Sequence, residues 1–404
     1  MFISLPSLAH SACLHALRCV AIDSSMVLCV CVGSAATTEL ATWSVPGSGY
    51  ARGAGRVQQP SFSVNTTLVQ VPVVVTDRHG QPIDGLDKEA FQVSDNGRVV
   101  DIDSFVHVRV PLPDHDLWQK SKPAIASWSE PAAQRNRVLW IVFDDLHMSA
   151  VRVTVAQEIA RTLVQRWLGA GDLVGVRQVG GDTDETTLKG DVPAALKAIA
   201  AFRVRSQAAL LEQEEIERAL QLVSTLRAIG QTMGSLTDRR VSILLLSEGI
   251  GYDVFNVQAS GTPSITQGLQ GAMSALRRGN VVLYAIDPRG LTSTEGTAVE
   301  TGAAGGSVEA ALAGAANRVR VGQINLWQMA EETGGFASVN SNSFEPAIDR
   351  IGREMSDYYM LGFTPSDGRC EGGARRLTVK VRMPGVRVRA RQFYGCEQPK
   401  DGGH

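Results

Sequence analysis

The stretch Val138-Leu139-Trp140-Ile141-Val142-Phe143-Asp144-Asp145 decides the fold of this chain. Its first residues form a continuous apolar run, which is typical of a strand covered by helices on both faces of a sheet. Two aspartates follow at once, where such a strand would end. In doubly wound sheets, ligands bind at the carboxyl ends of the strands. The stretch therefore predicts a buried parallel strand with acidic groups at a candidate binding edge.

Apolar runs recur downstream and alternate with helical patterns. Residues 241–246 and 281–286 are predicted to be further buried strands, 172–176 a short strand, and 358–363 a last strand. Segments with helical spacing lie between them: 150–168, 192–202, 208–234, 265–278, 323–333 and 345–355. Repeated strand–helix units predict an α/β fold with a mostly parallel, doubly wound, Rossmann-like sheet.

β structure is expected on both sides of this region. Near the start, Asn96-Gly97 between two β-branched runs predicts a hairpin in a small antiparallel module. Near the end, valines alternate with charged residues around Met383-Pro384-Gly385, which predicts a C-terminal hairpin with an apolar and a basic face. The predicted parts are a leader 1–36, a linker 37–61, a β module 62–108, a linker 109–136, an α/β domain 137–365, a β hairpin 366–397 and a tail 398–404.

Composition bounds the class of protein. The 404 residues are 44% hydrophobic, which is enough for a sizeable core and excludes a long disordered chain. The 39 Lys and Arg nearly balance the 41 Asp and Glu, which argues against nucleic-acid binding. No stretch is apolar for the length of about 20 residues that a transmembrane helix needs. Residues 26–36 have the layout of a signal-peptide core and cleavage site, so we expect a secreted or periplasmic protein. A disordered leader or an upstream start codon is the alternative.

The cysteines divide into two groups. Four lie in the predicted leader, and Cys370 and Cys396 bracket the predicted hairpin. The absence of a Cys-x-x-C pair or a Cys/His cluster argues against zinc fingers and thioredoxin-type chemistry. Strand pairing in the hairpin would bring Cys370 and Cys396 together, which predicts a disulfide worth about 3 kcal/mol by loop entropy. Such a disulfide agrees with export from the cytoplasm.

Several segments, in order and spacing, match one family. They are residues 71–77, 85–91, 143–147, 239–249, 284–291, 330–335, 358–365 and 389–394. On these segments, across about residues 62–395, the chain resembles the bacterial VWFA-related proteins, frequent in Acidobacteria, which carry a von Willebrand factor type A domain. The resemblance implies a Rossmann-like sheet flanked by helices. It also implies a role in adhesion or protein interaction rather than catalysis.

The resemblance also implies a place for a metal ion. Type A domains often hold a divalent cation through an Asp-x-Ser-x-Ser loop after the first strand, with a Thr and an Asp from later loops. Counting from Asp144 places leucine and methionine at the two serine positions, and these cannot coordinate a cation. Counting from Asp145 places His147 and Ser149 there. The threonine position falls near Ser206.

The aspartate position of the motif corresponds to Glu248. The surviving oxygens predict a weakened Mg²⁺ or Ca²⁺ site. Its candidate ligands are Asp144, Asp145, His147, Ser149, Ser206 and Glu248. His147 would also suit a softer ion such as Zn²⁺ or Mn²⁺. The alternative is a metal-free edge, in which the two aspartates cap the following helix and arginines beside Ser206 take the place of the cation.

The partners follow from the same patterns. We expect a protein partner at the carboxyl edge of the sheet and no enzymatic activity, because nucleotide-binding and metalloprotease motifs are missing. Ser247 resembles a hydrolase nucleophile only weakly, since the glycine two residues earlier is absent and a histidine follows only at His404. A cationic cluster in the hairpin is either a solvated face or a site for an anionic envelope polymer: Arg375, Arg376, Lys380, Arg382, Arg387, Arg389 and Arg391. The runner-up function is a metal-free structural scaffold of the cell envelope.

Overall fold

The computed structural model describes most of the chain after residue 67. The described residues are 68–111, 136–169, 171–181, 188, 190–204, 212–234, 240–251, 263–292, 308–365 and 374–395. The predicted leader and the linker 37–61 lie outside them, as do Ser206, Cys370 and Cys396. The expectations for export and for the disulfide therefore stay predictions.

A parallel sheet forms the centre of the α/β region. Its strands are β5 (Val138–Phe143), β6 (Leu173–Gln178), β7 (Val241–Leu246), β8 (Val281–Ile286) and β9 (Ala337–Ser338). They lie in the order β6-β5-β7-β8-β9, and every neighbouring pair is parallel. The long apolar strands are buried on both faces, as a parallel sheet requires. This confirms the predicted α/β class with a parallel sheet flanked by helices, whereas the fifth strand of that sheet, β9, was not predicted.

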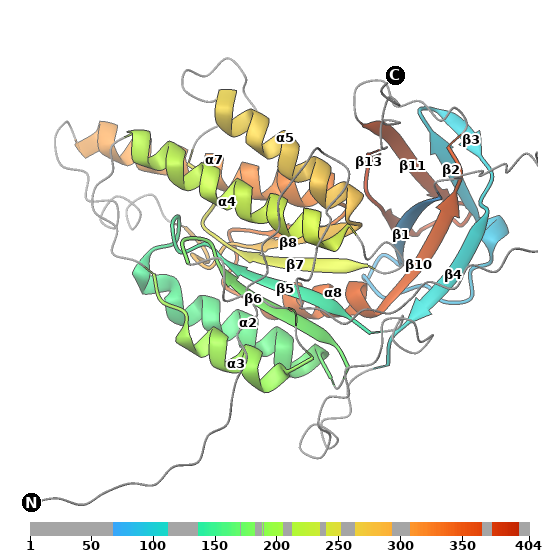
Figure 1. Ribbon diagram of the computed structural model, residues 1–404, viewed down its shortest axis with the longest axis horizontal. Helices are drawn as coiled ribbons and strands as arrows, with labels where there is room; N and C mark the ends of the chain where they lie inside the picture. The colour runs from blue at the N-terminus through green and yellow to red at the C-terminus, as the bar shows by residue number, and fades with distance from the viewer. Residues whose placement is uncertain are drawn as a thin grey trace, which may run out of the picture. The chain divides into compact units, whose positions relative to one another are not determined.

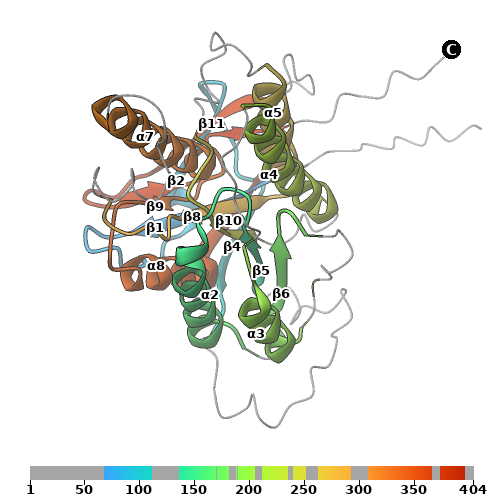
Figure 2. The ribbon, with the colours of Figure 1, turned by 90° about the vertical axis from the view of Figure 1, so that its left-hand side faces the viewer.

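Helices cover both faces of this sheet. They are α2 (Val153–Trp167), α3 (Val192–Ala201), α4 (Glu212–Met233), α5 (Pro263–Arg278), α7 (Val308–Glu332) and α8 (Glu345–Ser356). Alternate residues of each strand point to opposite faces, so Trp140 of β5 packs with α4, α5 and α7, whereas Leu139 and Ile141 pack with α2, α3 and α8. Figure 1 shows the two helical layers on either side of the strands, and Figure 2 shows α4 and α5 side by side.

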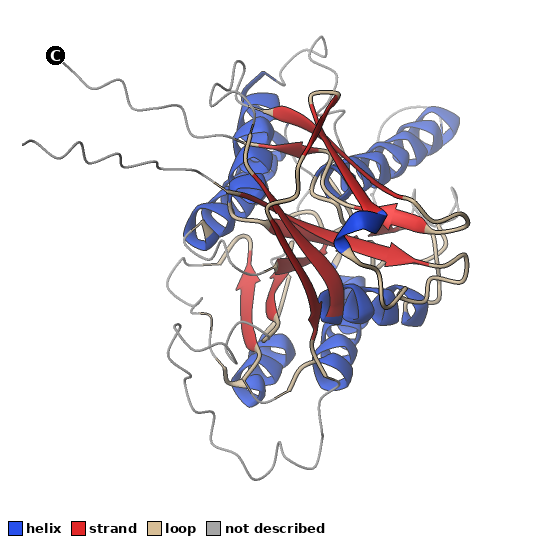
Figure 3. Cartoon of the chain, turned by 90° about the vertical axis from the view of Figure 1, so that its right-hand side faces the viewer, coloured by secondary structure: helices blue, strands red, loops and turns tan. Residues whose placement is uncertain are grey.

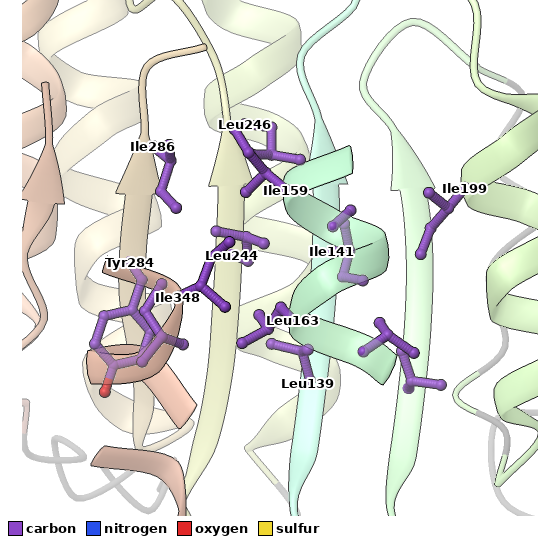
Figure 4. Close-up of a cluster of buried hydrophobic side chains, with 14 of the residues drawn as sticks. Leu139, Ile141, Ile159, Leu163, Ile199, Leu244, Leu246, Tyr284, Ile286 and Ile348 are labelled. Atoms are coloured by element: carbon purple, nitrogen blue, oxygen red, sulfur yellow. The ribbon is translucent and has the colours of Figure 1, made fainter. Parts of the chain in front are cut away.

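The core on the α2 side is a continuous aliphatic cluster. Ile159 and Leu163 of α2 and Ile348 of α8 lie in one cluster with strand side chains such as Leu139, Leu246 and Tyr284 (Figure 4). Burial of one such side chain stabilises the fold by about 1.5–3 kcal/mol. Removing a single one to alanine would cost about 2–5 kcal/mol because a cavity remains.

The end of α7 fixes the position of β9. Gly334 adopts a φ of +83°, and the Gly335 amide donates to the carbonyl of Ala330 at 2.9 Å, which closes the helix as the glycine pair predicted. A Cβ on Gly335 would lie 1.9 Å from the carbonyl oxygen of Leu283, so only glycine permits this approach to β8. The helix itself begins at Val308, well before the predicted residue 323.

The remaining strands form two antiparallel sheets. They are β1 (Val69–Thr76), β2 (Phe91–Asp95), β3 (Arg98–Val100), β4 (Ser104–Arg109), β10 (Asp357–Phe363), β11 (Arg375–Val381), β12 (Arg387–Arg389) and β13 (Phe393–Tyr394). One sheet has the order β12-β1-β10-β4 and the other β13-β11-β2-β3. Figure 3 shows these strands, which we call the β region. Asn96 and Gly97 both have positive φ between β2 and β3, which confirms the predicted hairpin.

Strand β10 differs from the prediction. The alternation of strands and helices in the sequence predicts β10 in the parallel sheet. In the structure, β10 pairs antiparallel with β1 and β4. Its apolar run is buried on both faces in either setting, so the run alone does not distinguish them. Tyr359 and Leu361 of β10 pack in the β-region core with Val71 of β1 and Phe91 of β2.

The predicted C-terminal hairpin also differs. β11 pairs with β2 on one side and with β13 at Arg375 and Arg376 on the other, whereas β12 pairs with β1 in the other sheet. Only the first two residues of β11 therefore pair with a later strand, β13. Strand β12 does not pair with β11. The expectation of a two-stranded hairpin of β11 and β12 was wrong because both strands have apolar sides that distant N-terminal strands cover. Among the described residues, no helix is long and apolar enough to span a bilayer.

Candidate functional site at the carboxyl edge of the parallel sheet

The direction in which strands are added to the sheet reverses between β5 and β7. From β5 the chain first adds β6 on one side and then β7 on the other, so the connections diverge at this point. Open α/β sheets bind ligands outside the carboxyl ends of the strands where the order reverses. Asp144 and Asp145 directly follow β5, and Ser247 and Glu248 directly follow β7. The predicted acidic residues therefore lie at the expected edge.

Asp144 is fully buried and contacts three residues at this edge. Its Oδ2 accepts the hydroxyl of Ser247 at 2.6 Å, and Nδ1 of His147 lies 2.9 Å from each carboxylate oxygen. Oδ1 also accepts the backbone amides of His147 and Leu146. Burial alone would raise the pKa of Asp144, but the charge and hydrogen bonds of His147 and the hydroxyl of Ser247 outweigh it and lower that pKa. The carboxylate is thus held ionised.

Asp145 turns away from Asp144. Its Oδ1 accepts the amide of Gly180 at 2.7 Å, and its Oδ2 accepts the side-chain amide of Gln178 at 2.8 Å. Both partners belong to the segment that follows or ends β6. Asp145 therefore ties the β5 loop to the β6 loop, on the opposite side from β7.

Glu248 joins the loop after β5 to the loop after β8. Its Oε1 accepts the backbone amide of Ser149 at 2.8 Å, and its Oε2 lies 3.9 Å from Nε of Arg289. Burial raises the pKa of Glu248 to about 7, although Arg289 and the Ser149 amide oppose the rise. The charge of Glu248 therefore changes near neutral pH.

Asp287 and Arg289 complete the edge, and the sequence reading did not assign them to the site. The Arg289 guanidinium donates to the fully buried Asp287 carboxylate at 2.7–3.0 Å and to the backbone carbonyl of Glu248 at 2.6 Å. Gln323 of α7 also donates to Asp287, at 3.3 Å. The available signal was positional: Asp287 follows a buried strand immediately, just as Asp144 does.

The structure brings the predicted ligands into separate pairs rather than one cluster. Asp144 and His147 are in contact, and Glu248 contacts the backbone of Ser149, while Asp145 faces β6. Ser206 lies outside the described residues. In the part of the chain that the structure describes, no three His, Cys, Asp or Glu residues form a group able to hold a metal ion.

The hydrogen-bond donors around these carboxylates decide whether their oxygens are free to bind a divalent cation. A divalent cation needs several oxygen atoms with free lone pairs pointing at one centre. Here N–H and O–H donors already occupy the carboxylates of Asp144 and Asp145, and the positive charge of Arg289 lies between Asp287 and Glu248. This arrangement does not favour a resident Mg²⁺ or Ca²⁺, and whether one binds stays a prediction for a metal titration.

Ser247 lies in a geometry unlike that of a hydrolase nucleophile. Such a serine is exposed and donates to a histidine that an acid orients. Ser247 is buried and donates to Asp144, while His147 contacts the same carboxylate from another side. The acid therefore lies between the serine and the histidine. This order does not favour general-base activation of Ser247.

The cationic cluster predicted on the hairpin does not form a single solvated face. Arg375 is buried and pairs with the Asp95 carboxylate of β2 at 2.7 Å, and Arg391 is buried as well. Arg382 and Arg387 are exposed. The simple alternation of the sequence failed here because β11 and β12 belong to different sheets.

Comparison with known proteins assigns no family to the chain. No protein-family model matches it, and no curated protein matches it either. The function is therefore inferred from the geometry of the described residues.

Proposed function

We propose that the protein binds another protein through the carboxyl edge of its parallel sheet. The observation that carries this proposal is the exposure of two apolar side chains in the loops of that edge. Val151, after β5, is 66% exposed, and Leu291, after β8, is 61% exposed. Exposed apolar groups rimmed by polar residues are typical of interaction sites.

The charged residues between these loops support the proposal because they link the loop after β5 to the loop after β8. Glu248 links the backbone of Ser149 to Arg289, and Arg289 is anchored on Asp287. Loops fixed by buried charge-assisted bonds lose little conformational entropy on binding, so more of the contact energy appears as affinity. Val151 and Leu291 each lie two residues from one of these anchors.

The resemblance to VWFA-related proteins points in the same direction. A five-stranded parallel sheet flanked by helices is compatible with a type A domain, and domains of that kind are implied to act in adhesion or protein interaction. Fold-level likeness is analogy, so the proposal rests on the edge residues themselves.

The binding is proposed to be independent of a metal ion. The His147 ring contacts the Asp144 carboxylate and the Arg289 guanidinium contacts that of Asp287, where a cation would otherwise bind. The metal-dependent version predicts that a chelator abolishes binding. A scaffold whose contacts run through the β region predicts that changes at this edge have no effect.

A location outside the cytoplasm belongs to the same proposal. It rests on the layout of residues 26–36 and on the predicted Cys370–Cys396 disulfide. A free-thiol count on the mature, non-reduced protein tests it. Two reactive thiols per chain would contradict the disulfide.

The test is a capture experiment from envelope extract with matched variants. Wild type is compared with the double variant Val151→Ser/Leu291→Ser, and Val99→Ser in β3 is the control, because Val99 is 62% exposed but lies in the β region. We expect the double variant to lose a captured protein that the wild type and V99S retain, with or without EDTA. Retention by the double variant contradicts the proposal, and loss with EDTA alone supports the metal-dependent version.

A further inference from the structure

A cavity of about 550 Å³ lies where α7 and α8 meet the β region. It opens between β11 on one side and β12 with the residues that follow it on the other, because β12 pairs with β1 while β13 pairs with β11. Four arginines line it: Arg350, Arg376, Arg389 and Arg391. We call it the arginine cavity. It is separate from the acidic edge described above, since none of the edge residues lines it.

Arg391 is a buried cation without a carboxylate partner among the described residues. Its side chain is enclosed, with the residue 8% exposed, and its terminal nitrogens donate to the backbone carbonyls of Arg277 and Gln70. Its Nε has no hydrogen-bond partner in that part of the chain. Burial, with the nearby charge of Arg277, lowers the pKa of Arg391 to about 10, so it remains charged at neutral pH. A buried charge of this kind is costly until an opposite charge meets it.

Arg350 and Arg389 are only partly neutralised. Both approach one oxygen of Glu354, at 3.0 Å and 3.7 Å, and Arg240 approaches the other oxygen at 3.7 Å. The Glu354 carboxylate is therefore the shared ion-pair partner of three guanidinium groups. Both cavity arginines also lie over the ring of Phe336, at 3.9 Å and 5.4 Å from its centre, in favourable cation–π contact.

The mouth of the cavity adds further polar and aromatic groups. Arg376 is exposed on β11, and Glu331 is the acidic residue among the lining side chains. Trp327 of α7 is 49% exposed at the same place, and Thr378 offers a hydroxyl. Cations thus outnumber carboxylates around a space that is open to solvent, with an aromatic ring beside it.

We propose that the arginine cavity binds a small ligand that carries two or more carboxylate or phosphate groups. Guanidinium groups match such oxyanions through paired N–H donors, and a fixed fork loses little entropy on binding. The volume lies within the range of about 300–1,000 Å³ that is usual for small-molecule sites. Trp327 would cover the apolar part of the ligand. This site stands apart from the proposed protein-binding edge, so either proposal can fail alone.

The test is titration calorimetry of the full chain with citrate and with pyrophosphate. Each anion is kept below about 1 mM so that general salt effects on stability stay small. Triethyl citrate, which has the same skeleton without charge, is the neutral control. Binding of citrate alone assigns carboxylate ligands, and binding of pyrophosphate alone assigns phosphate ligands. Binding of both assigns oxyanions generally, and binding of neither overturns the proposal.

Matched variants locate the site. Arg376→Gln is exposed and should fold normally, and Arg389→Gln removes a cation deeper in the cavity. We expect each to weaken binding about tenfold or more, because a charge-assisted contact is lost. Arg387→Gln removes the same charge from β12 outside the cavity and should change the affinity less than about twofold. Equal loss in all three variants would mean unspecific charge attraction and would overturn the proposal.

Trp327 gives an independent reading of the same event. The bound ligand should change the tryptophan fluorescence of the wild type, and Trp327→Phe should remove that change while citrate or pyrophosphate still gives heat. An unchanged fluorescence response in W327F would place the ligand elsewhere and contradict the assignment.

Discussion

The acidic edge of the parallel sheet and the arginine cavity differ in how their charges are met. At the edge, each buried carboxylate already has donors from its own chain: Asp144 has Ser247 and His147, and Asp287 has Arg289. In the cavity, Arg391 donates only to backbone carbonyls among the described residues, and Arg350 and Arg389 share Glu354 with Arg240, which lies outside the lining. The carboxylates of the first region have their donors within the protein, whereas the second region has more guanidinium groups than carboxylates.

This difference changes where a ligand is expected. An acidic cluster after parallel strands predicts a metal site from sequence, yet built-in donors satisfy these acids. A basic stretch in a hairpin predicts a solvated face, yet part of it lies buried around a cavity. A ligand is expected where buried charged side chains outnumber side chains of opposite charge, and the presence of charged side chains alone does not predict one.

The largest expected effect comes from removing the centre of the acidic edge. Asp144→Ala leaves the buried Ser247 hydroxyl and the His147 ring without their acceptor, so we expect a loss of about 3–5 kcal/mol in the free energy of unfolding. Denaturant unfolding measures it. Asp101→Ala, at an exposed carboxylate, is the control and should change stability by less than about 0.5 kcal/mol. A loss in D144A below about 1 kcal/mol would show that the edge is not satisfied internally.

Glu248 should make the stability of the edge depend on pH. Its folded pKa of about 7 lies above the ordinary 4.5, so its stabilising effect is full below pH 4.5 and is lost as the pH rises through 7. Glu248→Gln keeps an acceptor for the Ser149 amide but does not titrate. We expect the stability of E248Q relative to wild type to rise by about 2–3 kcal/mol from pH 5 to pH 8. A pH-independent difference would remove Glu248 as the titrating group.

The cavity should respond differently to loss of its buried charge. Arg391→Met keeps the length of the side chain and removes a cation that has no carboxylate partner among the described residues. We expect stability to change by less than about 1 kcal/mol, in either direction, because the lost desolvation penalty offsets the lost hydrogen bonds to carbonyls. Urea unfolding at neutral pH measures it. A loss as large as that of D144A would mean that Arg391 is satisfied by the protein alone, and the contrast between the two regions would disappear.

The smallest effect on stability is expected at the exposed apolar residues of the edge. Val151→Ser/Leu291→Ser should change the free energy of unfolding by less than about 0.5 kcal/mol per site, because neither side chain is buried. Thermal melting of the purified variant checks this. A much larger loss would make its binding defect a folding defect and would remove it as evidence for the edge.

The sequence predicts the three central strands of the parallel sheet well because they are continuous apolar runs. Residues 138–143, 241–246 and 281–286 have no polar face, and only a sheet covered on both sides buries them. The Gly334–Gly335 helix end and the Asn96–Gly97 turn were also predictable, since each needs a backbone conformation that few residues adopt.

Pairing between distant strands was not predictable. The apolar run of β10 would be equally buried in the parallel sheet or between β1 and β4, and only the tertiary arrangement chooses. β12 likewise pairs with β1, more than 300 positions earlier, as Val74 lies opposite Arg389. Local pattern carries no information on such partners.

The candidate site divides in the same way. The position of Asp144 and Glu248 at strand ends followed from the sequence. The partners of their oxygens did not, because the Arg289 side chain reaches back to Asp287 and the Asp145 side chain turns toward Gly180. The arginine cavity was hidden for the same reason: it exists only because β11 and β12 separate.

One thermal-shift experiment tests the contrast between the two regions most directly. Full-length protein, freed of metal with EDTA and dialysed, is melted with Mg²⁺, Ca²⁺ or Mn²⁺ in one arm and with citrate or pyrophosphate in the other, beside Arg389→Gln. Because donors of the protein already occupy the carboxylates of the edge, the cations should leave the melting temperature of the wild type unchanged. At least one of the two anions should raise it in the wild type but not in R389Q. Stabilisation by a divalent cation, with no response to either anion, would contradict the account.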